Sequence, residues 1–134
     1  MPELSSYDYA IVRVVPSVER GEFVNAGVIL FCRTRRFLRA RIHLDEARLL
    51  ALSPDIDLES VRHQLECIPL VCEGGKAAGP IGLLSQAERF HWLTAPRSTI
   101  IQPSPVHSGL TADPASALDH LESSMVLPPS AGQP

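Results

Sequence analysis

The stretch of sequence that decides the fold runs from Tyr7 to Leu44 and is YDYAIVRVVPSVERGEFVNAGVILFCRTRRFLRARIHL. It contains three segments rich in branched and aromatic residues, at positions 7–15, 23–32 and 37–44. Turn-forming residues separate the segments, a pattern typical of consecutive strands joined by short connections. The sequence therefore predicts an antiparallel sheet on which the rest of the chain packs.

The two faces of this sheet can be predicted separately, because residues two apart in a strand point to the same side. In the third segment Leu38, Ala40 and Ile42 share one face, and Arg39 and Arg41 share the other. The even-numbered positions of all three segments are therefore predicted to form the core face, and those of the second segment are Val24, Ala26, Val28, Leu30 and Cys32. Gly27 marks a place where a bulge would break this alternation.

Five arginines concentrate in one predicted hairpin, residues 33–41, here called the arginine hairpin: Arg33, Arg35, Arg36, Arg39 and Arg41. Residues 1–41 carry seven basic and four acidic residues, a balance of +3, whereas residues 42–134 carry five basic and eleven acidic residues, a balance of −6. Such a hairpin can meet phosphate, nucleic acid or an acidic partner. Alternatively, its charges protect a solvated sheet edge or pair with the acidic helices of the same chain.

Beyond Leu44 the apolar spacing becomes helical. Helices are predicted to begin at Asp45, at Asp57, at the capping box of Ser85 and Glu88, and at Asp113-Pro114, while residues 97–102 suit a fourth strand. The predicted fold is a single α+β domain, residues 7–124, with about four mainly antiparallel strands and helices packed on one face. Residues 1–6 are expected to be a flexible N-terminus and residues 125–134 a disordered tail.

Composition excludes several classes of protein. The 134 residues, with a net charge of −3, suffice for one compact domain but not for two. No apolar run reaches the roughly 20 residues of a membrane helix, and the first residues lack a secretory signal, so we expect a cytoplasmic protein without membrane association. The three cysteines and five histidines lack the spacing of a metal motif, so no metal or other cofactor is expected.

A glycine-rich run with one lysine, residues 74–82, is a second candidate for chemistry, because such runs can cradle phosphate. In a phosphate loop a hydroxyl residue follows the lysine, but here Lys76 precedes two alanines. The run is therefore predicted to be a flexible connection.

The polar segment after the third predicted helix is a candidate binding surface. Trp92, Thr94, Arg97 and Ser98 supply an aromatic face, two hydroxyls and a bidentate donor, which suit phosphate, carboxylate or a peptide edge. If the fourth strand pairs beside the first, Arg97 would lie near Arg13 and Asn25, and the three would form one pocket. Alternatively, Trp92 and Phe90 simply pack in the core.

The same segment also allows a catalytic hypothesis. Ser98 or Thr99 would act as nucleophile, His91 or His107 as base, and Arg97 as anion clamp, as acyl or phosphoryl transfer requires. The spacing does not support it, because no glycine-flanked elbow surrounds Ser98 and no acidic residue lies between Glu88 and Asp113. No catalytic residue is therefore assigned.

Three stretches resemble a known family: Tyr7-Asp8-Tyr9-Ala10-Ile11-Val12-Arg13-Val14-Val15-Pro16, Arg20-Gly21-Glu22-Phe23-Val24-Asn25-Ala26-Gly27-Val28-Ile29-Leu30-Phe31 and Arg89-Phe90-His91-Trp92-Leu93-Thr94-Ala95-Pro96-Arg97-Ser98. They closely resemble the bacterial family called domain of unknown function 3037, from Tyr7 to about Leu121. The resemblance implies almost no chemistry. It implies a partner, a kinase-like protein of the HipA toxin type, rather than a reaction.

The leading functional hypothesis is a small non-catalytic accessory module that binds a partner protein. The first alternative is direct nucleic-acid binding through the arginine hairpin, which the acidic net charge and the spacing of the aromatic residues weaken. The second is a small hydrolase or transferase with an Arg/Ser/His site. The sequence leaves the oligomeric state open, because an exposed strand edge can also be a dimer seam.

Overall fold

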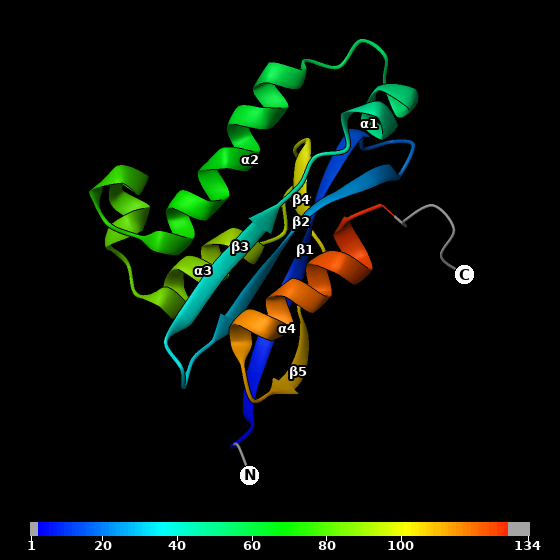
Figure 1. The fold of residues 1–134 in the computed structure, drawn as a ribbon. Helices are drawn as coiled ribbons and strands as arrows, with labels where there is room; N and C mark the ends of the chain where they lie inside the picture. Colours follow the sequence, from blue (N-terminus) through cyan, green and yellow to red (C-terminus); the bar gives the residue numbers. More distant parts are fainter. Residues whose placement is uncertain (1–2, 129–134) are drawn as a thin grey trace.

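The long first strand, β1 (Ser5–Ser17), organises the sheet in the computed structural model, which describes residues 3–128 (Figure 1). It pairs with β2 (Glu22–Cys32), which in turn pairs with β3 (Phe37–Ile42). On its other side, β1 pairs first with β5 (His107–Thr111) and then with β4 (Ile101–Pro103). All pairings are antiparallel, and the order is β3-β2-β1-β4 with β5 beside β1. The predicted single α+β domain with a mainly antiparallel sheet is confirmed.

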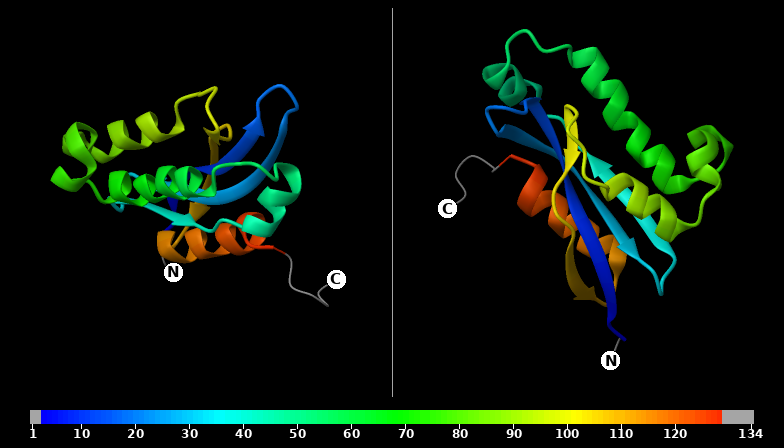
Figure 2. Two further views of the ribbon diagram at one scale, coloured as in Figure 1. Left: turned by 90° about the horizontal axis from the view of Figure 1, so that it is seen from above. Right: turned by 180° about the vertical axis from the view of Figure 1, so that it is seen from behind.

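Helices cover both faces of this sheet (Figure 2). One face carries α1 (Glu46–Leu52), α2 (Leu58–Glu73), the 3-10 turns η1 (Lys76–Leu83) and α3 (Gln86–Thr94). The other carries α4 (Pro114–Leu121) and the π-helical turn η2 (Glu122–Val126). The α-helices begin at the predicted caps, because Asp45, Asp57, Ser85 and Asp113 each accept a bond from a backbone N–H of the first turn.

The main core lies between the sheet and the helices α1 to α3. Leu38 and Ala40 of β3 are buried in it together with Leu65 and Phe90, as the alternation in the third segment predicted. Val12 and Val14 of β1 also face this core. The even-numbered face of β1 and β3 is therefore confirmed as a core face.

In β2 the predicted alternation is wrong beyond Gly27. Val12 of β1 pairs with Gly27, but Arg13 pairs with Asn25, so Ala26 is the extra residue of a bulge. The bulge reverses the side on which the following residues point. Val28, Leu30 and Cys32 consequently leave the main core, where they were expected with Val24 and Ala26, and face a second core, while Ile29 and Phe31 take their place.

The second core explains why one helix lies on the face opposite to the others. Leu118, Leu121 and Val126 are buried against Ile11 and the displaced side chains of β2. The helices were expected on one face only, and α4 adds a cover to the other. Both sets of β2 side chains beyond Gly27 are apolar, so this face needs a cover in either register, and the bulge decides that Val28, Leu30 and Cys32 are the side chains that α4 covers.

The element boundaries differ from the predicted ones in a few places. β1 begins at Ser5, inside the expected flexible segment 1–6, and η2 reaches Val126, inside the expected tail 125–134; residues 1–2 and 129–134 of these segments lie outside the described part. The fourth strand forms at Ile101–Pro103, later than predicted. β5, which is largely exposed, was not predicted. The glycine-rich run, expected to be a plain connection, forms η1 with a kink at Gly79.

Candidate functional site

The arginine hairpin is a firmly held structure. Its turn is closed by the N–H of Arg36, which donates to the carbonyl of Arg33 at 3.1 Å, and Arg36 has a φ of +51°. The side chain of Gln86 on α3 donates to the carbonyl of Arg36 at 3.0 Å. Arg35 donates from Nε to Ser5 Oγ at 3.0 Å and from Nη2 to the carbonyl of Glu3 at 2.8 Å. The turn is thus tied both to α3 and to the start of the chain.

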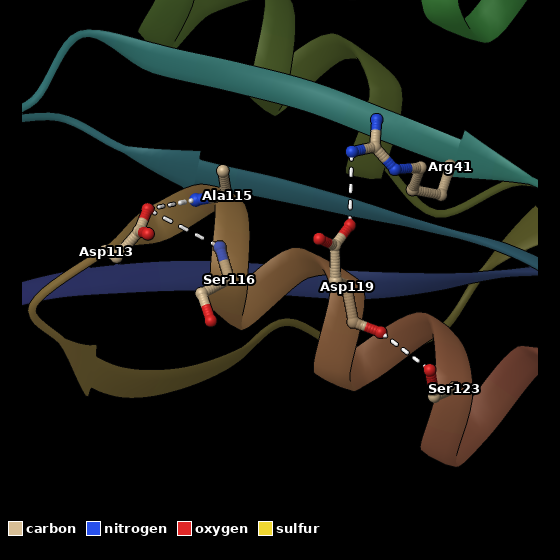
Figure 3. Close-up of polar contacts among 6 residues, drawn as sticks. All are labelled: Arg41, Asp113, Ala115, Ser116, Asp119 and Ser123. Atoms are coloured by element: carbon tan, nitrogen blue, oxygen red, sulfur yellow. Dashed lines mark hydrogen bonds and ion pairs between the residues drawn. The ribbon is translucent and has the colours of Figure 1, made fainter.

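Two of the five arginines are engaged within the molecule. Arg35 holds the N-terminal segment, and Arg41 donates from Nη2 to Asp119 Oδ1 of α4 at 3.1 Å (Figure 3). The expectation that some arginines pair with acidic helices of the same chain is therefore confirmed for Arg41. Asp119 can form this pair because α4 packs over the face of the sheet to which Arg41 points, with Asp119 next to the Arg41 guanidinium (Figure 3).

Three arginines remain available to another molecule. Arg33, Arg36 and Arg39 are exposed, and none of them forms an ion pair within residues 3–128. The guanidinium of Arg39 lies 4.8 Å from the centre of the Phe37 ring, which restricts its position without neutralising its charge. These three cations, here called the free arginines, all belong to the hairpin that leads into the edge strand β3.

A groove runs beside β3, here called the edge groove. Its volume is about 550 Å³, and it is lined on one side by residues 36–41. Pro69, Cys72 and Glu73 of α2 form the other side, and Gln86 closes it near the turn. Burial raises the pKa of the Cys72 thiol to about 12, against a smaller opposing effect of Arg89. That thiol is consequently an apolar wall of the groove rather than a nucleophile.

A smaller pocket of about 200 Å³ lies beside Trp92, between α2, α3 and β4. The Arg97 guanidinium lies 4.6 Å from the centre of the Trp92 ring and donates from Nη2 to the Trp92 carbonyl at 2.5 Å. Ile68 and Leu93 supply apolar walls. Phe90 is 2% exposed and Trp92 is 42% exposed, so the alternative in which both pack in the core is confirmed for Phe90 and wrong for Trp92.

Most of the hydroxyl groups around this pocket donate hydrogen bonds to backbone carbonyls. Thr94 donates to the carbonyl of Phe90 at 2.8 Å, and Thr99 donates to that of Ile101 at 2.9 Å. Ser98 is exposed. His107 lies on β5 with its ring 5.5 Å from that of Tyr9. Within residues 3–128 no hydrogen bond joins Ser98 or Thr99 to a histidine, so the proposed nucleophile and base are not assembled here.

Arg13 and Asn25 lie together, as expected, but away from Arg97. They are partners in the pairing of β1 with β2, on the face that α4 and η2 cover, whereas Arg97 borders the main core. Asn25 donates to the carbonyl of Met125 at 3.0 Å, and the Arg13 guanidinium lies 4.2 Å above the Phe23 ring. Arg13 Nε and Asn25 Oδ1 are buried without a hydrogen-bond partner in the described part of the chain. The single pocket expected from Arg13, Asn25 and Arg97 therefore does not form, because these side chains lie on opposite faces of the sheet.

One important cation was not singled out from the sequence. Arg89 of α3 is buried, and its guanidinium donates to the carbonyls of Val71, Cys72 and Leu84. The available signal was its place beside Phe90 in a helix whose start is marked by a capping box. Its partners are backbone carbonyls, so no charge pattern in the sequence indicated it.

Two classes of site find no support in residues 3–128. No cluster of three or more histidine, cysteine, aspartate or glutamate side chains is arranged to hold a metal ion in that range. The helices there are all too short or too polar to cross a lipid bilayer.

Comparison with known proteins identifies the family of the chain. The family model described as Protein of unknown function (DUF3037) matches residues 9–126, so the chain belongs to this family. The match confirms the resemblance carried by the three sequence stretches. No curated protein and no solved structure matches the chain.

Proposed function

We propose that this DUF3037 protein is a non-catalytic module that binds another protein through its arginine hairpin. The observation that supports the proposal is the set of free arginines, Arg33, Arg36 and Arg39, which are exposed and unpaired by acidic side chains within residues 3–128. Guanidinium groups favour carboxylates, to which they bind in a bidentate manner. The partner surface is therefore acidic.

The way the hairpin is held also supports binding. The bonds from Gln86 and Arg35 keep the turn in one conformation before any partner arrives. A surface that is already ordered loses less conformational entropy on association, so more of the interaction energy contributes to affinity. Rigid charge also gives specificity, because it fixes where the carboxylates of the partner must lie.

The family resemblance suggests which partner to test first, a kinase-like protein of the HipA toxin type. We place the interaction in the cytoplasm, where Cys32, Cys67 and Cys72 stay as thiols. The hairpin offers only a small surface for contact, so we expect a small interface in which a few charged contacts determine the choice of partner.

Affinity purification of tagged protein from its own host tests the proposal. Wild-type protein is expected to recover a stoichiometric partner, and the double variant Arg33→Glu, Arg36→Glu is expected to lose it. Arg48→Glu is the matched control, because Arg48 is an exposed arginine on α1, outside the hairpin. Recovery of the same partner by the double variant would show that the hairpin does not bind it.

Nucleic acid is the competing ligand for the same arginines. Phe37, the aromatic residue of the hairpin, lies under Arg39 and is half-buried, so it offers no free face on which a base can stack. A gel shift with duplex and single-stranded DNA and RNA decides between the two ligands. Binding that falls steeply with salt and is lost in Arg36→Glu would replace protein binding as the function of this surface.

A further inference from the structure

β3 has a free backbone edge. It pairs with β2 and lies at the end of the sheet in the described part of the chain. The N–H of His43 donates to the carbonyl of Ala26 at 2.8 Å, which fixes the alternation of the backbone groups. Following this alternation along β3, the N–H and C=O groups of residues 37, 39 and 41 face β2, whereas those of Leu38, Ala40 and Ile42 face outward.

The edge groove lies where an added strand would run. It follows β3 from Phe37 to Arg41, a length of about 16 Å at about 3.3 Å per residue, and continues to Arg36 in the turn. Pro69, Cys72 and Glu73 of α2 stand along it, so a segment bonded to the edge would also contact a helix. About five residues of extended chain match this length, and a sixth reaches the turn.

The charges around the groove select the kind of segment that fits. Arg36, Arg39 and Arg41 line it against one acidic residue, Glu73, and the balance stays positive even though Arg41 also pairs with Asp119. In an added strand, the residues opposite Arg39 and Arg41 would point to the same face as these arginines. Acidic residues are favoured at these positions, because opposite charges in directly opposed positions stabilise a strand pair. The residues in between point toward the α2 side, where Pro69 and Cys72 favour apolar side chains.

The same charges argue against a second copy of this chain as occupant. Antiparallel pairing of two β3 edges centred on Ala40 would place Arg39 of each copy directly opposite Arg41 of the other. Like charges in directly opposed positions destabilise a strand pair. Asp119, the acidic partner of Arg41, pairs with one of its nitrogens only and leaves Arg39 unneutralised.

We propose that β3 accepts an extended segment of a partner protein as an additional antiparallel strand, with alternating acidic and apolar residues in the edge groove. The inference rests on the proposed protein-binding function and states how the partner is held. The main-chain bonds to Leu38, Ala40 and Ile42 supply a generic part of the affinity, and the carboxylates opposite the arginines supply the choice of segment.

Amide exchange followed by NMR tests the proposal without any substitution. The probe is a capped six-residue peptide of alternating glutamate and valine, and the matched control is the same peptide with lysine in place of glutamate. In free protein we expect the amides of Leu38, Ala40 and Ile42 to exchange fast and those of residues 37, 39 and 41 to exchange slowly. The glutamate peptide is expected to slow the first set by about tenfold or more. Slowing elsewhere, no binding, or equal binding of the lysine peptide would overturn the proposal.

The variant Ala40→Pro provides an independent test. Proline removes an N–H that faces outward, a change that edge strands tolerate, and it breaks no bond to β2. Circular dichroism checks the fold, and the exchange experiment remains decisive if the variant does not fold. We expect the folded Ala40→Pro variant to bind neither the glutamate peptide nor the partner protein. If it keeps the partner while the double variant Arg33→Glu, Arg36→Glu loses it, the hairpin binds protein but strand addition is wrong.

Failure of the proposed function has a different signature. If wild-type protein recovers no partner, the proposed function fails, but the exchange experiment still tests whether β3 accepts an added strand. Sedimentation covers the remaining occupant: a wild-type dimer that becomes monomeric in Ala40→Pro would make the edge a seam between copies and overturn the proposal.

Discussion

Replacing Arg89 with methionine is expected to destabilise the protein strongly. The side chain is 8% exposed, and it donates from Nη1 to the carbonyls of Val71 and Cys72, at 2.8 and 2.6 Å, and from Nε to that of Leu84 at 3.1 Å. Val71 and Cys72 lie in the last turn of α2, whose carbonyls lack partners within the helix and carry the negative end of its dipole. Arg89 forms no salt bridge within residues 3–128 and so acts as a cap supplied by another helix.

The size of the effect follows from these three bonds. A hydrogen bond from a charged donor contributes about 1.5–3 kcal/mol, but bonds made by one group are not additive, and methionine avoids the cost of burying a cation. We therefore expect the free energy of unfolding to fall by about 3–5 kcal/mol, a large share of a typical stability of about 5–15 kcal/mol. For a chain of this length the midpoint of thermal unfolding falls by roughly 10–18 °C.

Urea and thermal unfolding followed by circular dichroism measure this change. Arg89→Lys keeps the charge but not the planar fork, so its midpoint is expected between those of the wild type and Arg89→Met. Arg48→Met is the matched control and is expected to unfold like the wild type, because Arg48 is exposed and its side chain forms no ion pair in the described residues. If Arg89→Met unfolds within about 2 °C of the control, the three carbonyls do not depend on this guanidinium and the argument fails.

Three further predictions concern other parts of the fold. Gly27→Ala should lower the free energy of unfolding by about 1–3 kcal/mol in urea titrations, because the added Cβ would lie 2.8 Å from the carbonyl oxygen of Arg41; wild-type stability would contradict the close approach at the bulge. At pH 8, peptide mapping after alkylation should find Cys67 modified and Cys72 unmodified until urea is added. Burial raises the pKa of Cys72 from 9.0 to about 12, so the thiol loses its proton at a lower pH in the unfolded chain than in the folded one. The free energy of unfolding should therefore fall as the pH rises from about 9 toward 12. The fall should be less steep in Cys72→Ala, which has no thiol at this position. Asp113→Ala should lower the free energy of unfolding by about 1 kcal/mol, because it removes the cap of α4 (Figure 3). Asp113→Asn should keep most of the wild-type stability, because its side-chain oxygen can still accept the cap bonds. Equal losses of stability in the two variants would show that these bonds do not stabilise α4.

The strands β1 to β3 and the helix starts were predictable because their signals are local. Alternation along residues 37–42 placed Leu38 and Ala40 in the core, and the caps Asp57 and Ser85 act on N–H groups within three residues of themselves. The two faces of β2 were not predictable beyond Gly27. Which residue is skipped in a bulge depends on the opposing strand, so Val28 and Leu30 could not be assigned to the second core from β2 alone.

The candidate site was predictable in part for the same reason. Neighbouring strands bring Arg13 beside Asn25, and a hairpin gathers its own arginines, so both groupings follow from the chain order. The separation of Arg97 from Arg13 depends on the face toward which the chain turns before β4, which residue patterns do not encode. Asp119 as partner of Arg41 likewise requires α4 to cross the sheet on that face.

By itself, the amino-acid sequence determined an α+β domain, its first three strands, most helix starts and the clustering of arginine in one hairpin, because each depends on residues a few positions apart. Only the tertiary structure decided that α4 covers the second face, that Arg89 caps α2, and that within residues 3–128 three arginines form no ion pair and β3 keeps an unpaired edge. These features depend on contacts between residues far apart in the chain, many of them to backbone groups that every residue has in common.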